Sequence, residues 1–186
     1  MRRPVAGGSP EMVLEEAAGL EWGYMCLLTR GSLCVLHQEE GKQAVFYSPD
    51  PVRGGRDRIG TIEAGYPHWG ISPNGSRLTL VDQQKCKGRI EMLTLSDRAW
   101  REIPVEPGWG DFQDINWAAD GKGLFVTSWL PDSIALLYVS LAGKVKPLVR
   151  NGHRQWMASP LASPDGKWLA YQAHTWDGNV WMLESF

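Results

Sequence analysis

Histidine and aspartate are the residues of this 186-residue sequence whose types suit acid–base chemistry. Asp111 and Asp114 stand three residues apart in the segment GWGDFQDINW. A pair of carboxyl groups is the set that glycan hydrolases use for acid–base chemistry, and histidine is a general acid or base in many other enzymes. The plainer interpretation is that the carboxylates are solvated and the histidines are scattered at strand ends. The four histidines are each solitary in the sequence: His37, His68, His153 and His174.

The motifs that mark common catalytic sites are missing from the sequence. It contains no G-x-S-x-G elbow, no H-E-x-x-H pair, no phosphate-binding P-loop and no C-x-x-C pair. We therefore expect no enzymatic activity, no cofactor and no bound metal.

Aromatic residues offer a different chemistry, which is binding. The chain holds 10 tryptophans, and exposed aromatic clusters mark surfaces that bind proteins or sugars. Packing of the same rings in small cores is the alternative interpretation. The aromatic candidates for a binding surface are Tyr66, Trp69, Trp129, Trp156 and Trp176.

Cys26 and Cys34 flank the short segment LLTRGSL (27–33). If a hairpin centres on Arg30, Cys26 lies directly opposite Cys34. Opposed residues at a non-hydrogen-bonded position have Cβ atoms near the distance that a disulfide requires. A disulfide fits an oxidising bacterial periplasm, whereas two buried free thiols fit the cytoplasm, and the sequence leaves both open. Cys86 has no evident partner.

Composition and charge exclude several classes of partner. The chain is 43% hydrophobic and 22% charged, with a formal net charge of −2. This balance gives no electrostatic reason to expect nucleic acid. No apolar run approaches the roughly 18 residues of a membrane span, so membrane insertion is not expected.

An internal repeat supplies the elements that position these residues. Three segments align on a turn: WGISPNGSRLTLVD (69–82), NWAADGKGLFVTSW (116–129) and PLASPDGKWLAYQAH (160–174). Their glycines, Gly75, Gly121 and Gly166, recur at 46 and 45 residues, and glycine supplies the positive φ that closes such a turn. Gly31, 44 residues before Gly75, is the turn glycine of a degenerate fourth copy, CLLTRGSLCVLHQ.

Each copy continues with a third strand and a fourth strand. Four short strands in each repeat of 40–50 residues are typical of a β-propeller blade. We predict an all-β propeller of about four blades, or a partial propeller closed by oligomerisation. The predicted units are a partial blade at 1–16, blades at 20–64, 66–105 and 112–149, and an incomplete last blade at 157–186.

The two ends of the sequence complement each other in this scheme. Residues 2–7 and 11–15 resemble a third and a fourth strand, whereas the last repeat supplies a first, second and third strand, the third at 178–185. A strand at 11–15 could therefore complete the last blade and cover its exposed edge.

Inner-strand starts and the loops between second and third strands share one face of a propeller. The candidates gather there as a rim that binds a ligand or partner: Tyr66, His68, Trp69, Asp114, Trp129, His153, Trp156, His174 and Trp176. Trp117, Trp168 and Trp181 fall within strand patterns instead, and we expect them to pack between blades.

The repeat resembles the bacterial TolB-like, WD-type propellers. The resemblance rests on LCVLHQEEGKQAVFYSPDPVRGGR, INWAADGKGLFVTS and TWDGNVWMLESF. The sequence is similar in particular to propellers at the C-terminal ends of bacterial multidomain sensors and regulators. The resemblance implies a propeller fold and a role as the input part of a regulator, but it does not imply a particular ligand.

We expect a non-catalytic module that binds a protein or peptide through one loop face. The alternative is a propeller that binds or processes carbohydrate through the loops of Asp111, Asp114 and His153. Self-association is also expected, because unpaired strand edges tend to be covered by another copy.

Overall fold

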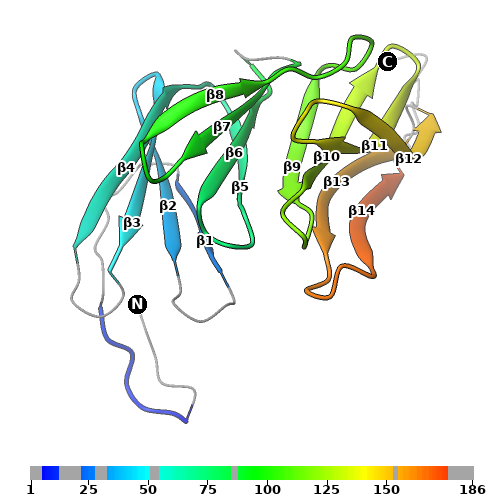
Figure 1. Cartoon of the computed structure of the whole chain (residues 1–186). Helices are drawn as coiled ribbons and strands as arrows, with labels where there is room; N and C mark the ends of the chain where they lie inside the picture. Colours follow the sequence, from blue (N-terminus) through cyan, green and yellow to red (C-terminus); the bar gives the residue numbers. More distant parts are fainter. Residues whose placement is uncertain are drawn as a thin grey trace, which may run out of the picture.

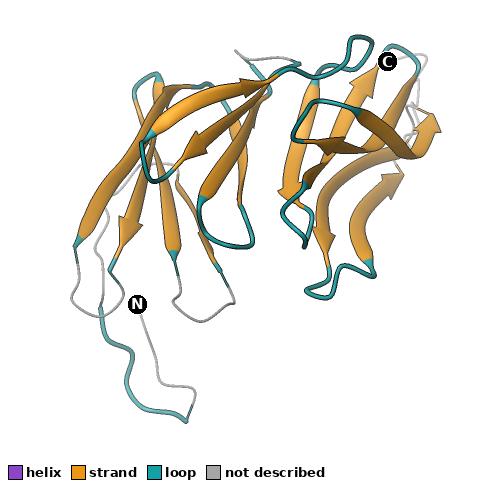
Figure 2. Ribbon diagram, in the orientation of Figure 1, coloured by secondary structure: helices purple, strands orange, loops and turns teal. Residues whose placement is uncertain are grey.

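The computed structural model describes residues 6–12, 22–27, 33–50, 55–84, 88–152 and 155–175. These residues form fourteen β-strands, and no helix occurs among them (Figure 2). The part of the chain so described accordingly has no helix that could cross a membrane. The all-β prediction is confirmed.

The strands form four antiparallel sheets that follow one another along the chain (Figure 1). The first sheet contains β1 (Trp22–Cys26), β2 (Cys34–Glu40), β3 (Gln43–Pro49) and β4 (Arg56–Glu63). The second contains β5 (Pro67–Ile71), β6 (Arg77–Asp82), β7 (Ile90–Thr94) and β8 (Ala99–Ile103). The third contains β9 (Phe112–Trp117), β10 (Gly123–Leu130), β11 (Ser133–Ser140) and β12 (Val145–Gly152). The last contains β13 (Gln155–Ala162) and β14 (Leu169–Thr175).

Every sheet pairs its strands in sequence order, which is the up-and-down arrangement of a propeller blade. The third strand predicted for the last blade, at 178–185, lies outside the described residues. Most of the two N-terminal strands predicted at 2–7 and 11–15 also lies outside them, and Glu11 forms a single β-bridge.

The repeated turns have nearly the same geometry in three blades. The turn glycines Gly75, Gly121 and Gly166 have φ of 70°, 68° and 68°, a region that only glycine enters readily. In each turn the glycine N–H donates to the carbonyl of the residue three positions earlier, at 2.8–2.9 Å. The preceding Asn or Asp side chain accepts the N–H two residues on, as in Asn74–Ser76, Asp120–Lys122 and Asp165–Lys167.

The first hairpin has the register that the sequence predicts. Cys26 pairs with Cys34, and the neighbouring Leu27 N–H donates to the carbonyl of Leu33 at 3.0 Å. Cys26 and Cys34 are joined by a disulfide, with Cα atoms 4.1 Å apart. A covalent bridge therefore ties β1 to β2.

Hydrophobic clusters lie between successive blades, because each strand presents alternate side chains to the neighbouring sheet. Val35, Phe46 and Leu78 belong to a cluster shared by the first two blades. A second cluster joins the next pair, and a third packs Met157 against Leu136.

Two predictions about tryptophan packing have different outcomes. Trp117 is 4% exposed and belongs to the cluster between the second and third blades, as expected. Trp168 is 75% exposed, so the expectation that it packs between blades is wrong. It stands at the end of a turn, where no sheet formed by the described residues covers it. Trp181 lies outside the described residues.

Two opposite edges of the blades matter for function. We call the loop face the edge formed by the starts of β5, β9 and β13 and the ends of β6, β10 and β14. We call the turn face the edge formed by the turns at 72–77, 118–123 and 163–168. The register pairs of each hairpin place these two edges at opposite ends of the inner strands.

Candidate functional site

A carboxylate ties three inner strands together at the loop face. Oδ1 of Asp114, on β9, lies 3.5 Å from Nδ1 of His68, on β5. Oδ2 of Asp114 accepts the backbone N–H of Ser159, on β13, at 2.6 Å. Ser159 has φ of 52° at an irregularity in the β13–β14 register, and this local bend supports the contact. Asp114 therefore links the second, third and last blades.

The environment of Asp114 favours its ionised form. Burial opposes ionisation and raises the pKa of Asp114, but the hydrogen bonds from His68, Ser159 and the backbone N–H of Ile115 outweigh burial. The pKa of this carboxyl is lowered on balance. Asp114 is thus a hydrogen-bonded structural carboxylate rather than a proton donor at neutral pH.

His68 has both ring nitrogens engaged. Its Nε2 lies 3.1 Å from Nε2 of Gln83, and that same amide group donates to the carbonyl of Gln113 at 2.9 Å. The amide can only donate, so Nε2 of His68 is the acceptor and Nδ1 carries the hydrogen that faces Asp114. Neither nitrogen is left to take a proton from a substrate.

A buried aspartate shapes the loop that precedes β5. Asp82 is 1% exposed. Its carboxylate accepts the N–H groups of Gly65 and Tyr66, and that of Gln84 at 2.7 Å. The loop so held leaves Tyr66 48% exposed, with its ring centroid 5.4 Å from that of His68.

Other aromatic candidates stand at the same face. Trp129 is 44% exposed near the end of β10, and its backbone N–H donates to the carbonyl of Asp111 at 3.1 Å. Trp156 and His174 pair across β13 and β14, with ring centroids 5.5 Å apart. His174 is exposed and Trp156 is half-buried.

One predicted rim residue lies elsewhere. Trp69 packs against the core between the first two blades, with its ring centroid 5.6 Å from that of Phe46. Its side chain alternates with that of His68 along β5 and therefore points away from the rim. His153 and Trp176, the remaining candidates, lie outside the described residues.

Sequence reasoning missed the polar partners Gln83, Gln113 and Ser159. A signal for one of them was present. His68, Asp114 and Ser159 each precede the first residue of a repeated turn by four positions. Equivalent positions on adjacent inner strands lie side by side in a propeller, so this alignment places the three in one row.

The described residues of the loop face bring hydrogen-bonded polar groups and aromatic rings together. The described residues contain no group of three or more His, Cys, Asp or Glu side chains that could hold a metal ion. The arrangement is a row of mutually satisfied polar groups bordered by exposed aromatic rings, which suits binding by surface contact.

Comparison with known proteins gives results from solved structures alone. No protein-family model matches the chain, and no curated protein matches it. TolB from Acinetobacter baumannii aligns with a TM-score of 0.62 at 22% identity, covering 75% of this chain and 34% of that chain. A putative TolB from Agrobacterium tumefaciens aligns with a TM-score of 0.62 at 17% identity, covering 77% and 50%.

A third likeness involves an enzyme. Prolyl oligopeptidase B from Galerina marginata aligns with a TM-score of 0.58 at 15% identity, covering 82% of this chain and 27% of that chain. This chain spans half or less of each of the three proteins. At such identities the likenesses concern the fold. Together with the strand order and the packing between blades, they show that the chain has the fold of a TolB-like β-propeller.

Proposed function

We propose that the chain is a non-catalytic recognition module, of the kind that gives a regulator its input, and that it binds a protein or peptide through the loop face. The observation that carries the proposal is the exposure of Tyr66 and Trp129 at the loop face, the face that also holds the Trp156–His174 pair. Tyr and Trp provide large contact areas at little cost in side-chain entropy, and they dominate the binding energy of many interfaces.

The hydrogen bonding of the loop face supports binding rather than catalysis. Asp114 accepts three hydrogen bonds, and both nitrogens of His68 are engaged. A general acid or base needs a free position within hydrogen-bond reach of the substrate. The same network holds three inner strands in a fixed relation, which reduces the entropy that a partner must overcome on binding.

A carbohydrate ligand is the second candidate. The exposed indole of Trp129 and the half-buried indole of Trp156 favour it, because flat aromatic rings also stack on sugars. The bonding of Asp114 counts against the hydrolytic form of this alternative, so a glycan would be bound rather than cleaved.

Selection of peptides on the immobilised protein tests the proposal. A random peptide library displayed on phage should yield binders whose affinity falls about tenfold or more in Tyr66→Ala and Trp129→Ala. Trp168→Ala is the matched control, because this indole is 75% exposed on the turn face, and the variant should bind normally. Peptides that bind all four proteins equally would contradict the proposal.

A glycan array on the same variants separates the two candidates. The proposal predicts no glycan binding that depends on Trp129. Glycan binding that disappears in Trp129→Ala but persists in Trp168→Ala would favour the carbohydrate alternative instead.

Self-association is a further part of the proposal. Among the described residues of the last sheet and its turn, Leu161, Trp168 and Tyr171 are exposed apolar side chains, and such surface tends to be covered in an oligomer. Light scattering on a sizing column should give a mass above that of one chain, 20.8 kDa. A monomer at micromolar concentration would refute this part alone.

A further inference from the structure

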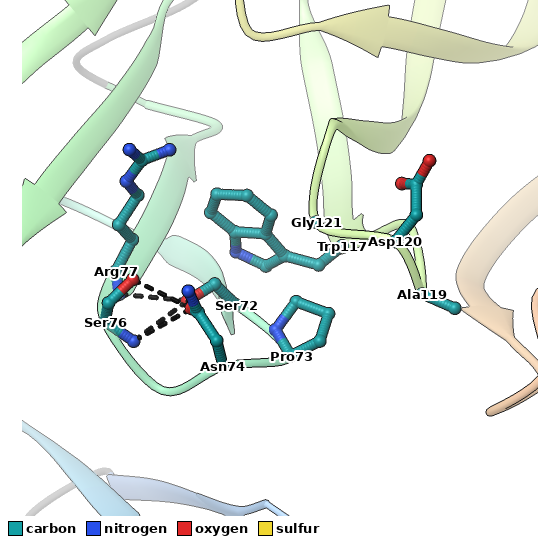
Figure 3. Close-up of a pocket in the computed structure, with 9 residues that line it drawn as sticks. All are labelled: Ser72, Pro73, Asn74, Ser76, Arg77, Trp117, Ala119, Asp120 and Gly121. Atoms are coloured by element: carbon teal, nitrogen blue, oxygen red, sulfur yellow. Dashed lines mark hydrogen bonds between the residues drawn. The ribbon is translucent and has the colours of Figure 1, made fainter.

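A cavity opens on the turn face, away from the recognition surface proposed above. It has a volume of about 350 Å³ and lies between the turns at 72–77 and 118–123, which belong to adjacent blades (Figure 3). Sites for small molecules commonly have volumes of about 300–1,000 Å³. The cavity is therefore the size of an amino acid or a very short peptide rather than of a protein segment.

Two opposite charges line this cavity without pairing with each other. Arg77 comes from one turn and Asp120 from the other, and no ion pair joins them (Figure 3). Within the described part of the chain the guanidinium of Arg77 makes no hydrogen bond or ion pair. The bonds of Arg77 to the turn come from its backbone, whose N–H donates to Oγ of Ser72 and whose carbonyl accepts the N–H of Ser72. Oδ1 of Asp120 accepts the N–H of Lys122 at 2.9 Å, and Oδ2 accepts no hydrogen bond from the residues described.

An apolar wall lies between these charges. The indole of Trp117 stands between Arg77 and Asp120 in Figure 3. Its Nε1–H donates to the carbonyl of Gly70 at 3.2 Å, so the polar edge of the ring is already satisfied. Pro73 and Ala119 add further apolar surface. A ligand here would meet a cation, an apolar surface and an anion.

The internal repeat shows that folding of the turn does not require these charges. The position of Arg77 is occupied by Gly123 in the second turn and by Trp168 in the third. The position of Asp120 is occupied by Asn74 in the first turn, and this neutral amide accepts the same kind of backbone N–H. The third turn keeps an aspartate, Asp165, at that position, so only the charge of Arg77 is missing from both equivalent turns, and it is available for another role.

We propose that this cavity binds a small zwitterion, a free amino acid or a short unblocked peptide. The carboxylate of the ligand pairs with Arg77, its ammonium group pairs with Oδ2 of Asp120, and its apolar part lies against Trp117. Charge-assisted hydrogen bonds of this kind are shorter and stronger than neutral ones. The site is independent of the loop face and of any partner bound there.

Calorimetric titration with L-alanine and L-alanyl-L-alanine tests the assignment. At least one of the two should bind, and the one that binds better indicates the span between the charges. The C-terminal amide of that probe lacks the carboxylate, and its N-acetyl form lacks the ammonium group. Each should bind about tenfold more weakly or not at all.

Matched variants identify the residues responsible. Arg77→Gln and Asp120→Asn should each weaken binding about tenfold. Both should fold, because the other two turns carry uncharged residues at the position of Arg77, and the first turn carries Asn74 at the position of Asp120. Asp165→Asn makes the same change in the third turn and should leave affinity unchanged, as should Trp129→Ala on the loop face. Failure of both probes to bind the folded protein would overturn the proposal, and so would equal binding by Arg77→Gln.

Discussion

The two faces of the propeller use polar residues in opposite ways. At the loop face His68, Gln83 and Asp114 are bonded to one another or to neighbouring backbone. At the turn face Arg77 and Asp120 line a cavity about 350 Å³ in volume, and the guanidinium of Arg77 and Oδ2 of Asp120 have no hydrogen-bond partner among the residues that the structure describes. Among the described residues, His68, Gln83 and Asp114 thus form a hydrogen-bonded network at one end of the inner strands, whereas Arg77 and Asp120 keep charged atoms without a partner at the other.

The difference distinguishes polar side chains that are used to hold the fold together from polar side chains that are free to bind a ligand. A carboxylate that accepts several protein hydrogen bonds holds strands together, and its removal costs stability. A guanidinium without a partner in a cavity costs little to replace, and its loss affects binding. The loop face can therefore recognise a partner through its aromatic rings while its polar groups fix the framework.

The largest expected effect concerns a close backbone contact between the turn that joins β11 to β12 and the segment that follows β8. Gly143, with φ of 80°, leaves no room for a Cβ, which would collide with the carbonyl oxygen of Pro104 in the preceding blade. Gly143→Ala should lower the free energy of unfolding by about 2–4 kcal/mol, because the cost of a positive φ in alanine adds to the cost of the steric clash. Urea denaturation measures the change.

Gly41 provides the control for that substitution. It has φ of 66°, but nothing lies within 4 Å of the position of a Cβ. Gly41→Ala should cost only about 1 kcal/mol, the backbone part alone. Equal costs at Gly41 and Gly143 would show that the blades do not approach each other as closely as described.

A buried histidine without a hydrogen bond should make stability depend on pH. His37 is 6% exposed, its Nε2 has no partner among the described residues, and burial lowers its pKa to about 4. The unfolded chain takes up this proton near pH 6.5, before the folded protein does. The neutral imidazole of His37 therefore causes no loss of stability above pH 6.5. The free energy of unfolding falls by up to about 3 kcal/mol as the pH drops from 6.5 towards 4.

Replacement of this ring tests the assignment. His37→Phe keeps an aromatic ring beside Phe46 and Trp69, and it should flatten the stability profile between pH 6.5 and 4. Asp114, whose pKa is lowered, stabilises the fold above about pH 4 and loses that effect as pH falls further. An unchanged slope above pH 4 in the variant would rule out His37 as the cause.

A smaller effect is expected for the amide that links His68 to the third blade. Gln83→Leu removes the donor to Nε2 of His68 and to the carbonyl of Gln113. The loss should be about 1–2 kcal/mol, because two acceptors lose a partner. Gln43→Leu, at an exposed position of β3, should stay within about 0.5 kcal/mol. Similar values for both would show that the amide of Gln83 does not link the blades.

The smallest effect concerns the first turn. Oγ of Ser72 accepts the backbone N–H groups of Ser76 and Arg77. Ser72→Ala should cost about 0.5–1 kcal/mol, because the second turn folds with Ala118 at the equivalent position. Ala118→Ser should have an effect no larger than that. A cost above about 2 kcal/mol for Ser72→Ala would contradict the equivalence of the turns.

The sequence predicts the fold well because the repeat depends on short-range features, such as the residues of a turn, that can be recognised in the sequence. Gly75, Gly121 and Gly166 occupy positions where φ must be positive, and their spacing gives the blade length without any knowledge of tertiary contacts. The register of Cys26 with Cys34 also follows from a short hairpin. Local rules suffice wherever a few consecutive residues determine the geometry.

The candidate site was predicted only in part, because it depends on contacts between blades. Strand alternation shows that Trp69 and His68 point to opposite sides, but only packing shows which side is open. The exposure of Trp168 could not be read from its strand pattern, since the pattern does not show whether a neighbouring sheet covers the side chain. The sequence did not mark Arg77 as a site residue, because the oppositely charged Asp120, which lines the same cavity, is 43 residues away in sequence.

The most direct test of the contrast between the two faces replaces one aspartate by asparagine at each face and compares the free energies of unfolding of the two variants. Asp114→Asn sets an amide N–H against at least one of the donors His68, Ser159 and Ile115, and should cost about 2 kcal/mol. Asp120→Asn keeps the acceptor for Lys122 and should change stability by less than about 0.5 kcal/mol. Equal costs at the two positions would contradict the assignment of structure to one face and of free binding groups to the other.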